Sequence, residues 1–312
     1  MTDILYSYEQ QLYDRRFMNC AERHAIVFLK ERRSEVDWLF YRALVSTDEI
    51  WAQIIQQKKP KYNFVSGCFS TQDFAALGIA CHELRSDRYA AVKTDVDKLI
   101  HQQGFVLISG SVFYFDHCPE FRKKHLHHLV VLCGVDEGGQ RYDMVDDNMA
   151  SVMCRYQYNT RQVADFYENN GDRLVRYFTL DSFDVVQSRD YFKSAFSVYL
   201  KNFQDSQRFF TDIIPFLENA FETMDNKLHL LHDSFSILSG SRHLFSHYLS
   251  SLQYKSDWVN DARELGKSAF VLKSLMVKAG ITKRIDIDDI ATRIERLRQN
   301  EQALLQKLTA IL

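Results

Sequence analysis

Proline and glycine are scarce in this sequence. Its 312 residues include only 3 Pro and 11 Gly, while 46% of the residues are hydrophobic. So few turn-forming residues exclude a low-complexity or linker-rich chain, and the composition is typical of a well-packed, helix-rich globular protein. The length predicts two domains.

The sequence also has no large excess of one charge, no long apolar run and no closely paired cysteines. The formal net charge of −2 argues against a bulk nucleic-acid binder. No apolar run approaches the ~20 residues of a membrane helix, so we expect no contact with a membrane. The N-terminus, MTDILYSYEQQ, has neither a basic region nor an apolar core, so we expect no signal peptide. The 6 cysteines form no CxxC pair, which predicts free thiols in a reducing, cytoplasmic compartment.

The most informative stretch is residues 125–148, HLHHLVVLCGVDEGGQRYDMVDDN. An apolar run over 129–135 leads into a glycine-rich turn at 136–139, and a second strand over 141–145 ends on Asp146. Glycine-rich turns between short β-rich runs predict a hairpin. A hairpin brings the start of one strand beside the end of the next, so we expect His128 close to Asp146. A histidine oriented by a carboxylate is half of a nucleophilic site.

Cys20 is the candidate nucleophile. Asn19 before it is a good helix N-cap, and Glu22 lies where a capping box has its acid. Cys20 is then the first helical residue, where the backbone N–H groups and the helix dipole stabilise a thiolate. From position alone, a buried structural cysteine beside a cap is the alternative interpretation.

Histidines are clustered in both halves of the chain without the pattern of a metal site. In the hairpin, strand alternation places His125 and His127 on one face and His128 on the other, with no Cys or carboxylate to complete a set of ligands. Further histidines recur at helical spacing in the second half and are interpreted as helix-surface residues: His229, His232, His243 and His247. We therefore predict no metal and no bound cofactor.

The remaining pattern predicts an α+β fold. Helices are expected at 36–55, 89–102 and 160–168, and strands within 105–115, 151–158 and 173–180. Beyond residue 182 every segment has helical periodicity: 191–203, 209–235, 241–252, 257–278 and 287–311. Pro215 and Gly240 are interpreted as kinks or boundaries in this half. The predicted domains are 1–182, with an N-terminal helix and an antiparallel sheet, and 183–312, an all-helical subdomain.

Two longer stretches carry a family resemblance. FMNCAERHAIVFL, followed by LISGSVFYFDHCPEFRKKHLHHLVVLCGVDEGGQRYDMVDDN, resembles the butirosin biosynthesis protein H family over roughly residues 12–180. The resemblance implies a papain-like core of the C39-peptidase type with a helical C-terminal domain. It also implies that Cys20 is the nucleophile, His128 the base and Asp146 the acid that orients the base. Papain-like enzymes have a Gln a few residues before the cysteine, but this chain has Asp14 there. The backbone N–H of Cys20 and the side chain of Asn19 are left as the oxyanion donors.

The function implied by the resemblance is acyl transfer in secondary-metabolite biosynthesis. Cys20 would take an acyl group from a thioester on the phosphopantetheine arm of an acyl carrier protein and pass it to an amine. The basic residues Arg122, Lys123 and Lys124 would contact the acidic carrier. The alternatives are a cysteine hydrolase (peptidase or thioesterase) with the same triad, and a carrier-binding protein without catalysis. The helical half is expected to narrow the cleft or to form a homodimer interface.

Overall fold

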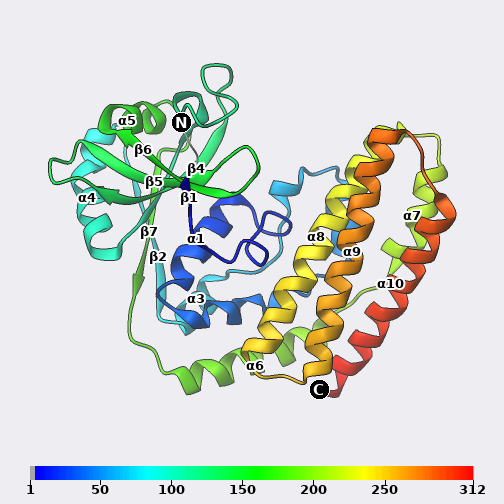
Figure 1. Cartoon of the computed structure of the whole chain (residues 1–312). Coiled ribbons are helices and arrows are strands. Elements are labelled where there is room, and N and C mark those ends of the chain that lie inside the picture. The colour runs from blue at the N-terminus through cyan, green and yellow to red at the C-terminus, as the bar shows by residue number, and fades with distance from the viewer. Residues whose placement is uncertain (1–3, 312) are drawn as a thin grey trace. The chain divides into compact units, whose positions relative to one another are not determined.

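The computed structural model describes residues 4–311, which form two compact units (Figure 1). Residues 4–34 and 74–183 make up the first, called the sheet unit below. Residues 35–73 and 184–311 make up the second, called the helical unit. Among the described residues, no helix has the length and apolar character that crossing a membrane requires.

The sheet unit is built on one antiparallel sheet of seven strands in the order β1-β6-β5-β4-β3-β7-β2. The strands are β1 Ile4–Leu5, β2 Ile79–Arg85, β3 Val106–Ser111, β4 His127–Val135, β5 Arg141–Asp147, β6 Met153–Asn159 and β7 Leu174–Leu180. Its helices are α1 Cys20–Lys30, α4 Tyr89–Gln103 and α5 Thr160–Glu168, with a short 3-10 helix at Val112–Tyr114. The α+β class predicted from the sequence is confirmed.

The main core of this unit lies between the sheet and two helices. Apolar residues of α4 and α5 pack on alternate residues of the strands, such as Val130 and Leu132 of β4 and Met144 of β5. Side chains two apart in a strand share a face, so this packing fixes which residues of β4 and β5 lie together.

The predicted hairpin is present as β4 and β5. Val131 pairs with Val145 and Leu132 with Met144, with an irregularity before Gly134. The turn contains Gly139 at a φ of 62°, a left-handed conformation that glycine adopts without strain. Continued by one residue from Val131, the register places Asp146 opposite Val130. Val130 lies two residues from His128, so His128 and Asp146 belong to the same face of the hairpin.

The helical unit combines the second half of the chain with an earlier segment. Its helices are α2 Thr47–Ile50, α6 Val185–Asn202, α7 Arg208–Glu218, α8 Met224–Ser251, α9 Ser256–Thr282 and α10 Ile287–Leu308, with α3 Thr71–Ala76 at the boundary of the units. Short 3-10 helices cover Ser34–Ala43, Lys61–Asn63 and Thr309–Ile311, and a π-helix covers Trp51–Gln56. The long helices α8, α9 and α10 run side by side in Figure 1.

The structure differs from the sequence-based division at residues 35–73. These residues were assigned to the first domain, but their aromatic side chains pack within the helical unit. The ring of Trp51 contacts Phe209 and Phe216 of α7, and Tyr41 contacts Tyr248 of α8.

The predicted helix boundary at Gly240 is also wrong. Helix α8 continues through Gly240, and Pro215 lies inside α7 without ending it. A glycine costs a helix roughly 1 kcal/mol relative to alanine. Because α8 is buried along most of its length, its packing offsets that cost. The break in this part of the chain instead lies between Glu218, where α7 ends, and Met224, where α8 begins.

Candidate active site

A capping box places Cys20 at the first position of α1. The side-chain oxygen of Asn19 accepts a hydrogen bond from the Glu22 N–H at 2.9 Å, and the Glu22 carboxylate accepts one from the Asn19 N–H at 3.0 Å. This is the cap predicted from the sequence. It leaves Cys20 at the helix end where unpaired N–H groups and the dipole favour a negative charge.

The three predicted site residues lie together in the sheet unit. The Sγ of Cys20 lies 3.5 Å from Nδ1 of His128, and Nε2 of His128 lies 2.7 Å from an oxygen of Asp146. The three residues come from α1, β4 and β5. With Nε2 donating to the carboxylate, Nδ1 of the neutral ring has its lone pair toward the thiol and can accept the thiol proton.

The electrostatics of these groups favour a thiolate beside an imidazolium. Burial alone would raise the pKa of the Cys20 thiol, but the hydrogen bond and charge of His128 outweigh it and lower that pKa. Burial likewise opposes protonation of His128, yet the charge and hydrogen bond of Asp146 raise the pKa of His128 well above its ordinary value. The pKa of Asp146 is lowered despite its burial, chiefly by the charge of His128.

Other cysteines lie in environments with the opposite effect. Burial raises the pKa of the Cys118 thiol, and the carboxylate of Asp146 raises it further. Burial also raises the pKa of Cys133 to about 11 and that of Cys81 above its ordinary value. Since the thiolate is the nucleophilic form, these three thiols are less reactive than Cys20 at neutral pH.

Two buried polar residues of α1 lie near Asp146 and Asp147 of β5, and sequence reasoning missed them. Arg23 is fully buried, forms an ion pair with Asp147 and donates to the carbonyl of Ser151 at 3.1 Å. His24 is also fully buried, with Nε2 3.9 Å from an oxygen of Asp146. Burial lowers the pKa of His24 to about 3, so this ring is neutral. Their signal in the sequence was two polar residues on the apolar face of α1.

A second histidine, His117, also binds Asp146. Its Nε2 lies 3.0 Å from the other carboxylate oxygen. In the sequence His117 belongs to the stretch DHCPEFRKK, whose composition indicates only a polar, basic loop. The available signal was its place in the connection from β3 to β4, because this connection begins beside the start of β4.

Asp14 and the predicted partner-binding residues lie outside the contacts of Cys20, His128 and Asp146 described above. Asp14, which occupies the place of the papain-like Gln, accepts a hydrogen bond from the Arg16 N–H at 2.8 Å and forms an ion pair with the Arg16 side chain. The predicted partner-binding residues Arg122, Lys123 and Lys124 are all exposed and lie in the loop before β4.

The neighbouring histidines, His125 before β4 and His127 at its start, bind other residues than Cys20 and Asp146. His125 stacks on Phe113, with ring centroids 4.2 Å apart, and binds the Ser111 hydroxyl at 2.9 Å. His127 binds the side chain of Asn170 at 2.9 Å. The alternation along the strand therefore separates His127 from His128, as expected from the sequence.

Within residues 4–311, two groups of side chains have the spacing that a metal ion needs. The ligand atoms of His229, His232 and Asp233 on α8 lie within 4.8 Å of one another, and so do those of His117, Cys118 and Asp146. In the second group both carboxylate oxygens already bind histidines, and we assign no metal to it.

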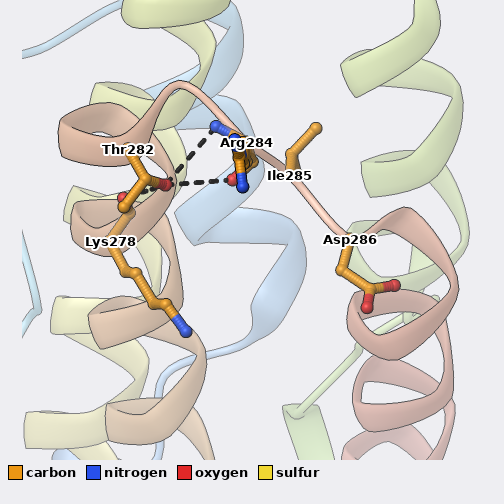
Figure 2. Close-up of a pocket in the computed structure, with 5 residues that line it drawn as sticks. All are labelled: Lys278, Thr282, Arg284, Ile285 and Asp286. Carbon is orange, nitrogen blue, oxygen red and sulfur yellow. Dashed lines mark hydrogen bonds between the residues drawn. The ribbon is translucent and has the colours of Figure 1, made fainter.

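A hollow in the helical unit contains none of the predicted site residues. It has a volume of about 570 Å³ and is lined by Lys278, Thr282, Arg284, Ile285 and Asp286, where α9 ends and α10 begins (Figure 2). The Thr282 hydroxyl donates to the carbonyl of Lys278 at 2.9 Å. Asp286 caps α10 by accepting from the Asp289 N–H at 3.0 Å. These bonds are local helix-end contacts.

Comparison with known proteins gives a relationship that spans nearly the whole chain. No protein-family model matches the chain. A curated protein from Niallia circulans is 23% identical over 312 aligned residues, which cover 95% of this chain and 97% of the relative. Its name is ribostamycin:4-(gamma-L-glutamylamino)-(S)-2-hydroxybutanoyl-[BtrI acyl-carrier protein] 4-(gamma-L-glutamylamino)-(S)-2-hydroxybutanoate transferase. The match includes the helical half, beyond the stretches that carried the resemblance. It confirms the resemblance to the butirosin biosynthesis protein H family, as a distant relationship along nearly the whole chain.

Proposed function

We propose that this chain is a cysteine acyltransferase with a papain-like core. It takes an acyl group from a carrier-protein thioester onto Cys20 and passes it to an amine, in a secondary-metabolite pathway. The observation that carries the proposal is the row of contacts from Cys20 through His128 to Asp146. The relative named above supports it, because that protein is a transferase acting on an acyl group bound to a carrier protein.

The first half-reaction forms an acyl-enzyme. His128 holds the proton of Cys20, and the thiolate attacks the carbonyl carbon of the donor thioester. The bond from that carbon to the carrier's sulfur breaks, and the leaving sulfur takes the proton from Nδ1 of His128. The products are a thioester on Cys20 and a free thiol on the carrier. Exchange of one thioester for another is nearly isoenergetic, which suits a cysteine nucleophile.

The second half-reaction releases the product as an amide. The amine attacks the acyl carbon, and neutral His128 accepts a proton from the amine nitrogen. The bond to Cys20 then breaks and restores the thiolate–imidazolium pair. Asp146 keeps Nε2 of His128 protonated in both steps, so that Nδ1 remains the atom that exchanges protons with the reacting groups.

Oxyanion stabilisation is assigned to the start of α1. The backbone N–H of Cys20 is one donor, and the side-chain amide nitrogen of Asn19 is the second. The capping bond uses the side-chain oxygen of Asn19, which leaves the nitrogen for this role. A donor of this kind contributes roughly 3 kcal/mol to lowering a barrier.

The experiment that tests the function supplies an acylated carrier protein with and without an amine. We expect amide formation by the wild-type chain and none by Cys20→Ala, with products identified by mass spectrometry. Rapid release of free acid at the same rate with and without the amine would show a hydrolase instead. No acyl turnover by a folded protein would leave only a carrier-binding role.

The carrier contact is tested by reversing the charges of Arg122, Lys123 and Lys124 to Glu. We expect the KM for the acyl carrier to rise, while a small acyl thioester reacts at the wild-type rate. Added salt should have the same effect, because exposed charges are screened beyond about 8 Å at physiological ionic strength. The control reverses three exposed basic residues elsewhere, Lys98, Arg161 and Lys201. Equal loss with both donors would indicate damage to the neighbouring hairpin.

A further inference from the structure

The carboxylate of Asp146 is held by two histidines. His128 binds one oxygen at 2.7 Å and His117 binds the other at 3.0 Å, each through Nε2. The His117 side chain is 3% exposed and Asp146 1%. In the proposed reaction His128 exchanges protons with the substrate, whereas His117 takes part in neither half-reaction.

Hydrogen-bond counting determines the charge of His117. Three bonds connect a row of four groups: Asp146 to His117 at 3.0 Å, His117 Nδ1 to the Tyr158 hydroxyl at 2.8 Å, and that hydroxyl to Asp116 at 2.6 Å. Each bond needs one proton. Between two carboxylates, a neutral histidine and a tyrosine supply only two.

The third proton belongs on the ring of His117. Tyr158 donates its own proton to Asp116, so its oxygen accepts from Nδ1. At the other end, Asp146 accepts from Nε2. Both ring nitrogens therefore donate, which makes His117 an imidazolium. Asp116 is exposed, so water stabilises its carboxylate. The charge of His128 and the hydrogen bonds of both histidines lower the pKa of Asp146 despite its burial, so this carboxylate also stays ionised.

The other neighbours of His117 do not compete for these bonds. The ring of Tyr156 stacks on the imidazole, with centroids 3.9 Å apart, and Phe115 stacks at 5.8 Å. The Sγ of Cys118 lies 3.4 Å from Nε2. Because both nitrogens of His117 carry protons, neither can accept the proton of this thiol. Cys118 is thus no second nucleophile, although it lies beside a histidine that binds the same carboxylate.

We propose that His117 is a positioning residue of the acyltransferase site, and this inference rests on the proposed function. As an imidazolium held by Tyr158 and Asp116, it fixes the Asp146 carboxylate so that one oxygen faces His128. Its positive charge also offsets part of the negative charge of Asp146.

The consequence concerns the proton on His128. A lone buried carboxylate would hold that proton strongly, which would slow its delivery to the leaving sulfur. The charge of His117 weakens this hold and stabilises the Cys20 thiolate. Removing the charge should therefore raise both apparent pKa values of the coupled Cys20–His128 pair.

The first test follows the alkylation rate of Cys20 by iodoacetamide against pH. In His117→Gln, which keeps amide donors but loses the charge, we expect the acidic limb of the profile to move up by about 0.5–1 pH unit. Tyr158→Phe should move it in the same direction, because Nδ1 loses its acceptor. Tyr142→Phe is the matched control, since it removes another buried tyrosine hydroxyl bound to a carboxylate, Asp97. Unmoved profiles in both test variants would overturn the proposal.

The second test observes the protonation of His117 in the wild-type chain, and a variant is used only to assign the signal. In the full chain with nitrogen-15-labelled histidine, NMR reports whether each ring nitrogen carries a proton. We expect both nitrogens of His117 to be protonated at pH 8, with the signal assigned by its absence in His117→Gln. A single protonated nitrogen at that pH would overturn the imidazolium and the proposal with it.

Neither measurement requires acyl transfer. If no donor thioester reacts but the alkylation profile shifts as expected, the proposed function fails while the assignment of His117 stands. If transfer occurs and the profile does not shift, the function stands and His117 only fills space.

Discussion

At the scale of single residues, the surroundings of two identical thiols, those of Cys20 and Cys118, determine which of them can react. Cys20 and Cys118 both lie beside a histidine that binds Asp146. The partner of Cys20 presents a nitrogen that can accept a proton, whereas both nitrogens of the other ring are occupied. Contact with an acceptor nitrogen, together with the end of α1, therefore distinguishes Cys20, the proposed nucleophile, from Cys118.

This difference predicts selective alkylation. With substoichiometric iodoacetamide near pH 6.5, we expect Cys20 to react first, since His128 lowers its pKa against the effect of burial. Burial raises the pKa values of Cys81, Cys118 and Cys133, so they should remain unmodified. Peptide mass mapping of the labelled chain provides the measurement. Preferential labelling of Cys118 would contradict the account.

His24 predicts a dependence of stability on pH. Burial lowers its pKa from 6.5 to about 3, so the unfolded chain binds a proton that the folded chain does not. The free energy of unfolding should fall as the pH drops from 6.5 toward 3, by about 1.4 kcal/mol per pH unit from this site. His24→Leu should lack that part of the slope in urea unfolding followed by circular dichroism. Parallel slopes for the two proteins would refute the prediction.

The contacts among Cys20, His128 and Asp146 could be predicted because their signals are local. A capping pattern identified Cys20, and a hairpin turn brought His128 near Asp146. His117 and His24 could not be found in this way, because their contacts with Asp146 join segments whose relation depends on the whole sheet. Hydrophobic periodicity shows which face of a helix or strand is buried. It does not show which polar group of a neighbouring element packs against that face.

At the scale of elements, α1 matters through its first turn. The capping box of Asn19 and Glu22 determines that the helix begins at Cys20. Moving the start by one residue would change the backbone at Cys20 and hence the direction of its thiol, which now contacts His128.

A change of the cap residue should therefore affect both stability and reactivity. Asn19→Ala is expected to cost about 1 kcal/mol of unfolding free energy and to slow the alkylation of Cys20. Asn19→Ser keeps a capping oxygen and should recover most of both properties. Chemical denaturation and the alkylation rate measure the two effects. If the alanine and serine variants were equally impaired, the cap would not be the cause.

Element types were predicted better where one face is buried than at the margins of the sheet. Strand β2 was missed because it lies at the edge of the sheet, where its exposed residues give only a weak alternation. The continuity of α8 was missed for the opposite reason. Its burial on almost every side supports a glycine that a solvent-exposed helix would tolerate less well.

At the scale of the whole molecule, the chain order of the two units is interleaved. Residues 35–73 leave the sheet unit, contribute to the helical unit and return. Within the helical unit, Asp205 accepts hydrogen bonds from both the N–H and the hydroxyl of Thr47, each at 2.7 Å. The segment therefore requires the C-terminal helices as partners. The sequence could not show this partnership, because the helical periodicity within residues 35–73 fits a helix of the first domain equally well.

Deletion of the C-terminal helices should be destabilising for this reason. A chain ending at residue 183 would expose the apolar faces of residues 35–73, including Trp51, which packs on Phe209 and Phe216 in the full chain. We expect it to aggregate, as measured by light scattering beside the full-length protein. A soluble, monodisperse and fully active shortened chain would contradict this expectation.

The most direct measurement of the central claim is the mass of the intact protein after reaction with an acylated carrier in the absence of an amine. We expect an increase equal to one acyl group, located on Cys20 by peptide mapping and released by adding an amine. Cys20→Ala should show no increase, although five cysteines remain. An adduct on any other residue, or none on a folded wild-type chain that turns over the donor, would contradict the account.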